Sequence, residues 1–225
     1  MREIFSDKYS QLALLWELDQ DLVYYIIRRY EKLYLNALED LKTKRIQLPP
    51  HFKDRRTDEE YIYDIIDGWL MEDIICDAWL RPRLIQKNSS IEIKVMGTNR
   101  DRVIQKYDSK AITTQPDLIF SLDGVEKRIE LQMARKILPN GYDMKESKVT
   151  RAIREENYFL WILIPTNEYF IINPSIELGT MQPKPNPLWG GKMVYHIDYT
   201  FIDKIGGLGK IKDSLSDTYF KKLGI

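Results

Sequence analysis

The stretch from residue 115 to 132 constrains the fold of this chain more than any other part of its sequence. Asp123-Gly124 is a strong signal for a two-residue β-hairpin turn, because both residue types tolerate the backbone angles that such turns need. The turn follows the apolar run 118–120, and the residues after it alternate, so Glu130 and Gln132 fall on one face of a second strand. We therefore predict a hairpin with Asp117 at its mouth, close to Glu130.

Two carboxylates on adjacent strands suit a hard divalent cation such as Mg²⁺, which proteins hold with one or two carboxylates together with water and substrate phosphate. The rest of the composition narrows the chemistry further. Cys76 is the only cysteine, so an internal disulfide framework is excluded. His51 and His196 are the only histidines, which leaves little material for a zinc site or a histidine-based triad. We expect catalysis to rest on carboxylates, amides and lysines, acting on a phosphate.

At these residues the chain resembles the PD-(D/E)XK nuclease superfamily, and most closely its type II restriction-endonuclease branch. Pro116-Asp117 match the PD, and Glu130-Leu131-Gln132 stand where the family has an acid, any residue and a lysine. The resemblance implies DNA hydrolysis with one or two Mg²⁺ ions bound by Asp117, Glu130 and the carbonyl of Leu131. Gln132 departs from the pattern, as some restriction enzymes do. It would orient the attacking water, but it carries no positive charge.

Lysines elsewhere could supply the charge that Gln132 lacks. Lys148 is our main candidate, with Lys145 and Lys106 as alternatives. A further acid comes from the helix predicted from the capping box at Thr57 to about residue 80. Glu72 interrupts an apolar stripe of this helix, and in the resembled family a glutamate on the helix before the sheet often joins the metal site. Two alternatives to a metal-site role for Glu72 remain. In one, Glu72 lies at the edge of the stripe and extends into solvent; in the other, Asp73 is the site residue instead.

The order of predicted elements also resembles the nuclease core, with a helix, three strands, a helix and two strands. Strands are expected at 91–95, 102–107, 117–121, 127–134, 159–164 and 169–172, and a second helix at 143–157. The fold class is α/β (α+β mixed), with a central mixed five-stranded sheet flanked by helices. Within one compact domain we expect extra N-terminal helices at 1–48, the nuclease core at 57–173, and a C-terminal excursion with a terminal helix at 174–225.

The charges of the chain cancel in total but are segregated along it. There are 34 basic and 34 acidic residues, and the segment 57–77 is acidic without a single Lys or Arg. This arrangement allows a basic DNA-binding surface around an acidic centre. The predicted DNA contacts come from three polar or basic segments and one apolar side chain that could wedge into a base step, although a core methionine is more common: Asn99, Arg100, Arg102, Lys136, Lys145, Gln182, Lys184 and Met71.

The resemblance implies a homodimer that acts on a palindromic site in double-stranded DNA. No apolar run is long enough for a membrane span and no secretion signal is visible, so we expect no membrane partner and a cytoplasmic protein. A structure-directed or mismatch-directed repair nuclease is the alternative within DNA enzymology. A catalytically silent binding module of the same fold is another, because Gln132 replaces the lysine. The blandest alternative is a structural α/β protein in which Glu130 and Gln132 form the solvent face of a hairpin.

Overall fold

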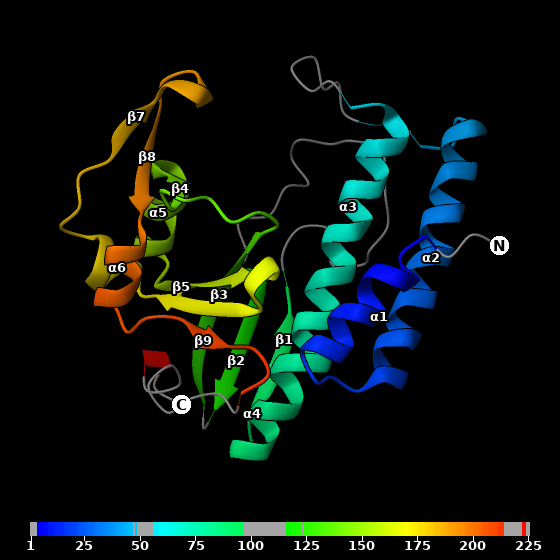
Figure 1. The fold of residues 1–225 in the computed structure, drawn as a ribbon, viewed down its shortest axis with the longest axis horizontal. Coiled ribbons are helices and arrows are strands. Elements are labelled where there is room, and N and C mark those ends of the chain that lie inside the picture. Colours follow the sequence, from blue (N-terminus) through cyan, green and yellow to red (C-terminus); the bar gives the residue numbers. More distant parts are fainter. Residues whose placement is uncertain are drawn as a thin grey trace. The chain divides into compact units, whose positions relative to one another are not determined.

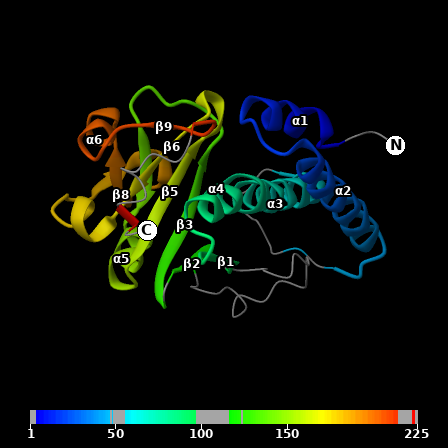
Figure 2. The same ribbon diagram turned by 90° about the horizontal axis from the view of Figure 1, so that it is seen from below.

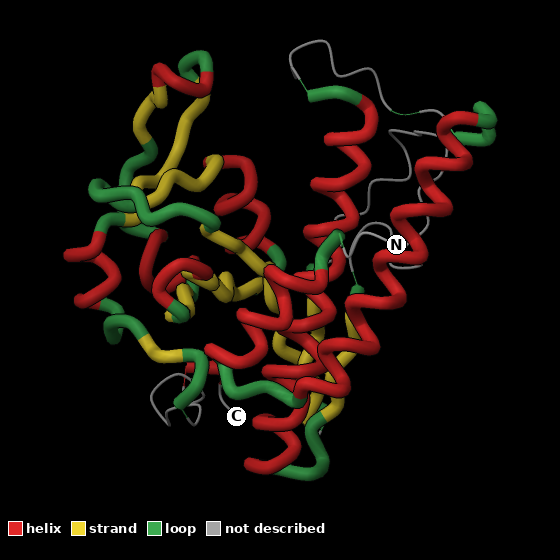
Figure 3. Tube along the Cα trace, turned by 45° about the vertical axis from the view of Figure 1, so that its right-hand side comes forward, coloured by secondary structure: helices red, strands yellow, loops and turns green. Residues whose placement is uncertain are grey.

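The structure, a computed structural model, describes residues 4–46, 48, 56–96, 116–122, 124–213 and 222–223. The chain forms two compact units, one made of residues 1–89 and 95–115 and the other of residues 90–94 and 116–225. Among the described residues, helices build the first unit and the strands gather in the second (Figure 3). No helix in the described part of the chain is both long and apolar enough to cross a bilayer.

The first unit consists of helices that follow one another along the chain (Figure 1). They are α1 (Ser6–Leu15), α2 (Gln20–Lys42), α3 (Asp58–Asp73) and α4 (Arg81–Lys87). The Asp19 carboxylate caps α2, and α3 starts with the predicted capping box, in which Thr57 and Glu60 each satisfy the other's backbone N–H. The predicted N-terminal helices are therefore confirmed, as is the helix that starts after Thr57.

This last helix does not end before Pro82, so the predicted end near residue 80 was wrong. A π-helical segment, Ile74–Leu80, follows α3 directly, and α4 continues from it with Pro82 in its first turn. The change from π to α hydrogen bonding starts a new first turn at α4. Pro82 is tolerated there because the N–H groups of a first turn are not needed for hydrogen bonds within the helix.

Three acidic side chains are buried in the first unit, and each has several donors. Asp67 accepts hydrogen bonds from the Tyr9 hydroxyl at 2.6 Å and from Lys8 at 2.9 Å. Asp73 accepts from the Tyr30 hydroxyl at 2.5 Å and pairs with Arg29. Glu31 bonds to Arg28 and to the start of α1. These donors tie α1 and α2 to α3, so the acids have a structural role that apolar periodicity alone does not reveal.

The second unit contains a six-stranded mixed sheet in the order β1-β2-β3-β5-β6-β9 (Figure 2). Its strands are β1 (Glu92–Val95), β2 (Leu118–Leu122), β3 (Val125–Ala134), β5 (Asn157–Leu163), β6 (Glu168–Ile172) and β9 (Gly209–Lys210). β3 runs parallel to β5, whereas β2 with β3, β5 with β6, and β6 with β9 are antiparallel. The predicted mixed α/β class is confirmed, although the sheet has one strand more than expected.

A second, three-stranded sheet has the order β4-β8-β7, and sequence analysis did not predict it. It comprises β4 (Tyr142–Lys145), β7 (Lys184–Asn186) and β8 (Lys192–Ile197). The residues from 143 to 145 were expected to begin a helix, but Asp143 lies in β4 and caps nothing; α5 (Glu146–Arg154) begins only after this strand. The C-terminal region was expected to be an excursion, yet it supplies β7, β8, β9 and α6 (Tyr199–Lys204).

The core of the second unit lies between the main sheet, α5 and the small sheet. One face of β5 and β6 presents Phe159, Trp161 and Phe170, and the last two rings stack with centroids 5.5 Å apart. Val149 and Ala152 of α5 are fully buried against this face. The same face of β3 presents the candidate catalytic residues, so α5 brings its own side chains to them.

Candidate active site

The β2–β3 hairpin brings Asp117 beside the strand that carries Glu130. The antiparallel register runs from Leu122 opposite Val125 to Leu118 opposite Ile129, so one step beyond the end of β2 residue 117 stands level with residue 130. Asp117 also extends the ladder, because its Oδ2 accepts a hydrogen bond of 2.7 Å from the backbone N–H of Leu131. The predicted hairpin and its open end are therefore confirmed.

Glu130 is the buried centre of the site, with only 3 % of its surface exposed. Lys148 Nζ lies 3.1 Å from one carboxylate oxygen, and Arg151 Nη2 lies 3.2 Å from the other. Both cations come from one face of α5, where residues three apart are neighbours. The two opposite charges offset the loss of water around the buried carboxylate. Lys148 was singled out from the sequence; Arg151 was not, although its i,i+3 spacing from Lys148 was available as a signal.

Gln132 lies on the same face of β3 as Glu130, two residues further on. Its side-chain amide donates a hydrogen bond to the carbonyl of Leu131, which is the backbone oxygen that the resemblance assigns to the metal. This hydrogen bond orients the Gln132 side chain along the part of β3 that extends beyond its pairing with β2. Both backbone polar atoms of Leu131 have side-chain contacts: its N–H donates to Asp117, and its carbonyl accepts from Gln132.

Buried polar atoms without a hydrogen-bond partner gather on this face. In the described part of the chain they include Arg151 Nε, Asn157 Oδ1 and Trp161 Nε1. In the parallel β3–β5 ladder, Asn157 pairs with Arg128 and Trp161 with Gln132, so the two residues flank Phe159, the partner of Glu130. Buried polar groups are almost always bonded, and exceptions call for an explanation. Arg151 contacts Glu130 directly, whereas Asn157 and Trp161 lie on the strand next to the one that carries Glu130.

The donor set fits Mg²⁺ in type but is small. Two carboxylates and one carbonyl are hard oxygen ligands, and Mg²⁺ commonly takes its remaining ligands from water and phosphate. No group of three or more His, Cys, Asp or Glu side chains suited to a metal is found in the described ranges. Protein donors contact both oxygens of Glu130, one oxygen of Asp117 and the carbonyl of Leu131. A metal would therefore have to displace or share these donors.

The other predicted site residues are spread over the molecule. Glu72 and Met71 belong to α3 of the first unit; Glu72 is partly exposed, whereas Met71 is 1 % exposed and packs as a core methionine, so we no longer assign it to DNA. Four predicted DNA contacts lie on the surface of the second unit, namely Lys136, Lys145, Gln182 and Lys184. The other predicted DNA contacts, Asn99, Arg100 and Arg102, fall outside the described residues. The predicted strand 102–107 and the alternative lysine, Lys106, fall outside them as well.

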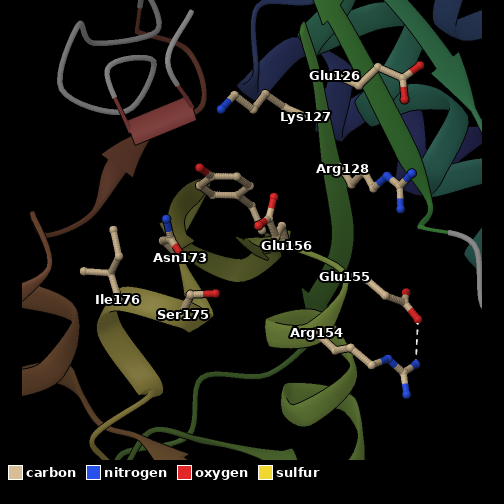
Figure 4. A pocket seen from close by; sticks show the side chains of 10 residues that line it. Glu126, Lys127, Arg128, Arg154, Glu155, Glu156, Asn173, Ser175 and Ile176 are labelled. Atoms are coloured by element: carbon tan, nitrogen blue, oxygen red, sulfur yellow. Dashed lines mark hydrogen bonds and ion pairs between the residues drawn. The ribbon is translucent and has the colours of Figure 1, made fainter.

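A hollow of about 840 Å³ opens near the start of β5 (Figure 4). It is lined by 126–128 of β3, by the turn 154–156, by Tyr158, and by Asn173, Ser175 and Ile176 after β6. Its three basic and three acidic side chains balance, and Arg154 pairs with Glu155 at 2.8 Å. Sequence analysis did not single out this hollow, and its mixed charges favour no particular ligand class.

Glu130 thus has a lysine and an arginine beside it and the Gln132 amide two residues further along the same face of β3, while the Asp117 carboxylate lies at the backbone of Leu131, the next residue. Such a set can bind a hard cation and offer positive charge to an anion beside it. No protein-family model matches this chain, and neither a curated protein nor a solved structure matches it.

Proposed function

We propose that the protein is a Mg²⁺-dependent endonuclease that hydrolyses phosphodiester bonds of double-stranded DNA, as a type II restriction endonuclease of the PD-(D/E)XK superfamily does. The observation that carries this proposal is the position of Lys148. The motif position of the lysine holds Gln132, yet an ammonium group from α5 lies 3.1 Å from the Glu130 carboxylate. The two carboxylates therefore come from the β2–β3 hairpin, and the positive charge beside Glu130 comes from Lys148 of α5.

The arrangement of elements supports the same proposal. Along the chain, α3 precedes β1, β2 and β3, and α5 precedes β5 and β6, which is the order expected for a restriction-endonuclease-like core. In space β3 lies between its hairpin partner β2 and the parallel strand β5. The acids belong to the β2–β3 hairpin and the cations to the helix that connects β3 to β5, so the connection itself completes the site.

Each residue then has a distinct role. Asp117, Glu130 and the Leu131 carbonyl would hold Mg²⁺, and the ion would supply a Lewis acid for the phosphate and for the attacking water. Gln132 orients that water through its amide. Lys148 contributes positive charge next to the reacting phosphate, where it stabilises the negative charge that develops. Arg151 fixes the second oxygen of Glu130 with a planar, permanently charged group, and we regard it as a positioning residue.

The substrate side of the proposal is a palindromic duplex bound by a cytoplasmic homodimer, since a two-fold protein presents the same groups to each half-site. One observation favours a second candidate, a catalytically silent nucleic-acid-binding module. All the intended metal ligands contact protein donors, as they would in a site that has lost its cation. A mismatch-directed or structure-directed repair nuclease differs from our first choice only in the DNA that it cuts.

Cleavage of plasmid DNA in the presence of Mg²⁺ tests the proposal. Asp117→Ala and Glu130→Ala should each lower the cleavage rate at least about 1000-fold, which corresponds to about 4 kcal/mol of transition-state stabilisation. Glu126→Ala is the matched control, because Glu126 lies on the same strand and is exposed. Circular dichroism should be the same for all three variants. Wild-type rates in both site variants would exclude this site.

The form of the products separates the candidates. Discrete fragments from random plasmid sequence indicate a site-specific enzyme, whereas cleavage confined to mismatched or branched DNA indicates a repair nuclease. If the wild-type protein binds DNA without cutting it, calorimetric titration with Mg²⁺ or Ca²⁺ in the presence of DNA decides. A silent module should show no metal-linked heat.

A further inference from the structure

The hairpin formed by β7 and β8 projects from the second unit (Figure 1). Lys184, Pro185 and Asn186 pair with Val194, Met193 and Lys192, and the turn between the strands comprises residues 187–191. Two large apolar side chains lie exposed in this turn, Leu188 with 93 % and Trp189 with 40 % of its surface in solvent. Exposed apolar side chains at the tip of a projecting element are typical of an interaction surface.

The turn is held in a defined conformation. The Asn186 side-chain oxygen accepts hydrogen bonds from the backbone N–H groups of Leu188 at 2.8 Å and Trp189 at 3.3 Å. Gly190 and Gly191 follow with φ angles of +66° and +78°, which favour glycine. The two apolar side chains are therefore presented by a fixed backbone, so little conformational entropy would be lost when they bind a partner.

The two faces of the small sheet differ sharply in composition. Alternate residues of β4 and β8, such as Met144 and Ile197, are buried in the core of the unit. The opposite face carries the buried side chain of Val194 and six polar side chains from all three strands, four of which are lysines or a histidine. The six polar residues are Asp143, Lys145, Lys184, Asn186, Lys192 and His196.

The outer face has an excess of positive charge that is available to a ligand. Asp143 is the only acid among these six residues, and it already accepts a hydrogen bond of 2.6 Å from Asn186 and contacts His196 Nδ1 at 2.8 Å. Lys145, Lys184 and Lys192 are exposed, and none of them forms an ion pair with a residue of the described ranges. Unpaired lysines on one surface are the electrostatic pattern that phosphate backbones attract.

We propose that the β7–β8 hairpin enters the major groove of duplex DNA. Lys145, Lys184 and Lys192 contact phosphates, while Leu188 and Trp189 pack against base edges and thymine methyl groups. The major groove admits a two-stranded β-ribbon, whose strands lie about 4.8 Å apart, and apolar side chains contact thymine there. Duplex DNA as the partner rests on the proposed function; the hairpin as the surface that binds it follows from shape, charge and the fixed turn.

The salt dependence of DNA binding tests this inference. Binding of a fluorescently labelled 30-base-pair duplex is measured by anisotropy over a series of salt concentrations, without divalent metal so that no cleavage occurs. Lys184→Gln/Lys192→Gln should reduce the slope of log K against log[salt] by roughly 2, since each phosphate contact contributes about 0.9. Lys204→Gln/Lys212→Gln makes the same change of charge at exposed lysines outside the small sheet and should leave the slope unchanged.

The exposed tip is tested separately. Leu188→Ser should weaken binding about tenfold and leave the salt slope unchanged, because apolar contacts release no counterions. The inference is overturned if the two double variants show equal slopes, if Leu188→Ser binds like the wild type, or if the wild type does not bind the duplex. All substituted side chains are exposed, and equal melting temperatures verify that the variants fold.

Failure of this inference and failure of the proposed function give different results. Glu130→Ala should lose cleavage but retain the wild-type salt slope. If it does so while the hairpin variants behave like their controls, the hairpin is not the DNA-binding surface but the nuclease site stands. If neither the wild type nor any variant cleaves DNA, but the hairpin lysines still determine the salt slope of DNA binding, the hairpin binds DNA and the nuclease proposal fails.

Discussion

Buried carboxylates in the two units have very different surroundings. In the first unit, Asp67 and Asp73 each receive a tyrosine hydroxyl and a basic side chain. In the second unit, Glu130 receives two basic side chains, yet Arg151 Nε on the same helix, and Asn157 Oδ1 and Trp161 Nε1 on the neighbouring strand, have no partner in the described structure. Among the described residues, every buried side-chain polar atom without a partner belongs to the second unit.

If our proposal is right, this difference separates acids that hold helices together from an acid that takes part in chemistry. Folding stability favours buried polar groups that are fully bonded, because each unsatisfied group costs about 1–3 kcal/mol. A binding site must instead retain polar atoms for its ligand, so it departs from this rule. Incomplete hydrogen bonding around Glu130 is therefore better evidence of function than the acid itself.

Replacement of Lys148 has the largest effect expected on this comparison. Lys148→Gln should lower the DNA cleavage rate about 100-fold, which corresponds to about 2.7 kcal/mol, because the site loses the charge that Gln132 cannot supply. Arg154→Gln, on the same helix, removes an exposed charge and should leave the rate unchanged. Equal rates for the two variants would mean that Lys148 only neutralises Glu130.

Removal of a donor from a closed acid should affect stability and not activity. Tyr9→Phe deprives buried Asp67 of a charged hydrogen bond and should lower the free energy of unfolding by about 2 kcal/mol, measured by urea denaturation. Tyr24→Phe, at an exposed position of α2, should change it by less than about 0.5 kcal/mol. A fall in the cleavage rate per folded Tyr9→Phe molecule would contradict a purely structural role for Asp67.

Removal of an unpartnered polar atom should not lower the free energy of unfolding, in contrast to the loss of a donor to Asp67. Asn157→Leu replaces a buried amide, whose Oδ1 has no partner and whose Nδ2 makes one long bond of 3.4 Å to Glu155. The free energy of unfolding should remain the same or rise by up to about 1 kcal/mol, because an unmet hydrogen-bonding demand is removed. If the free energy of unfolding fell by about 2 kcal/mol or more, the two regions would not differ in how completely their buried polar groups are hydrogen-bonded.

The smallest effect concerns the thiol of the first unit. Burial, followed by the nearby Asp77 carboxylate, raises the pKa of Cys76 to about 12. The thiol therefore stays almost wholly protonated between pH 7 and pH 10, so its labelling by a thiol reagent should be slow, and the rate should still be rising at pH 10 because the thiolate fraction keeps growing below the pKa. A free cysteine, with a pKa of about 8.5, would react faster across this range. Complete labelling in urea, and none in Cys76→Ala, are the controls.

Local signals predicted the part of the site that lies within one hairpin. Asp123-Gly124 fixed the turn, and the alternation after it placed Glu130 and Gln132 on one face. Lys148 was also expected, because its helix follows the hairpin closely. Asn157 and Trp161 were missed because their proximity to Glu130 depends on the parallel register of β3 and β5, which joins strands connected through β4 and α5.

The same limit applies to the fold. The small sheet escaped prediction because its strands are short, because Pro185 lies within β7, and because β4 is separated from its partner β8 by more than forty residues. Pro82 was taken to end a helix, since the π-helical segment before it leaves no simple periodic signal. Patterns within a window of several residues report local structure, whereas pairing between distant strands is decided by packing.

The connection between Leu122 and Val125 contains only two residues, and this short length has a consequence for the acid pair. One inserted residue would shift β3 by a single step, and in a strand such a step turns every side chain to the opposite side. Glu130 would then point away from α5, and Ile129 would take its place opposite Lys148. Activity should therefore tolerate many substitutions in this turn but not a change in its length.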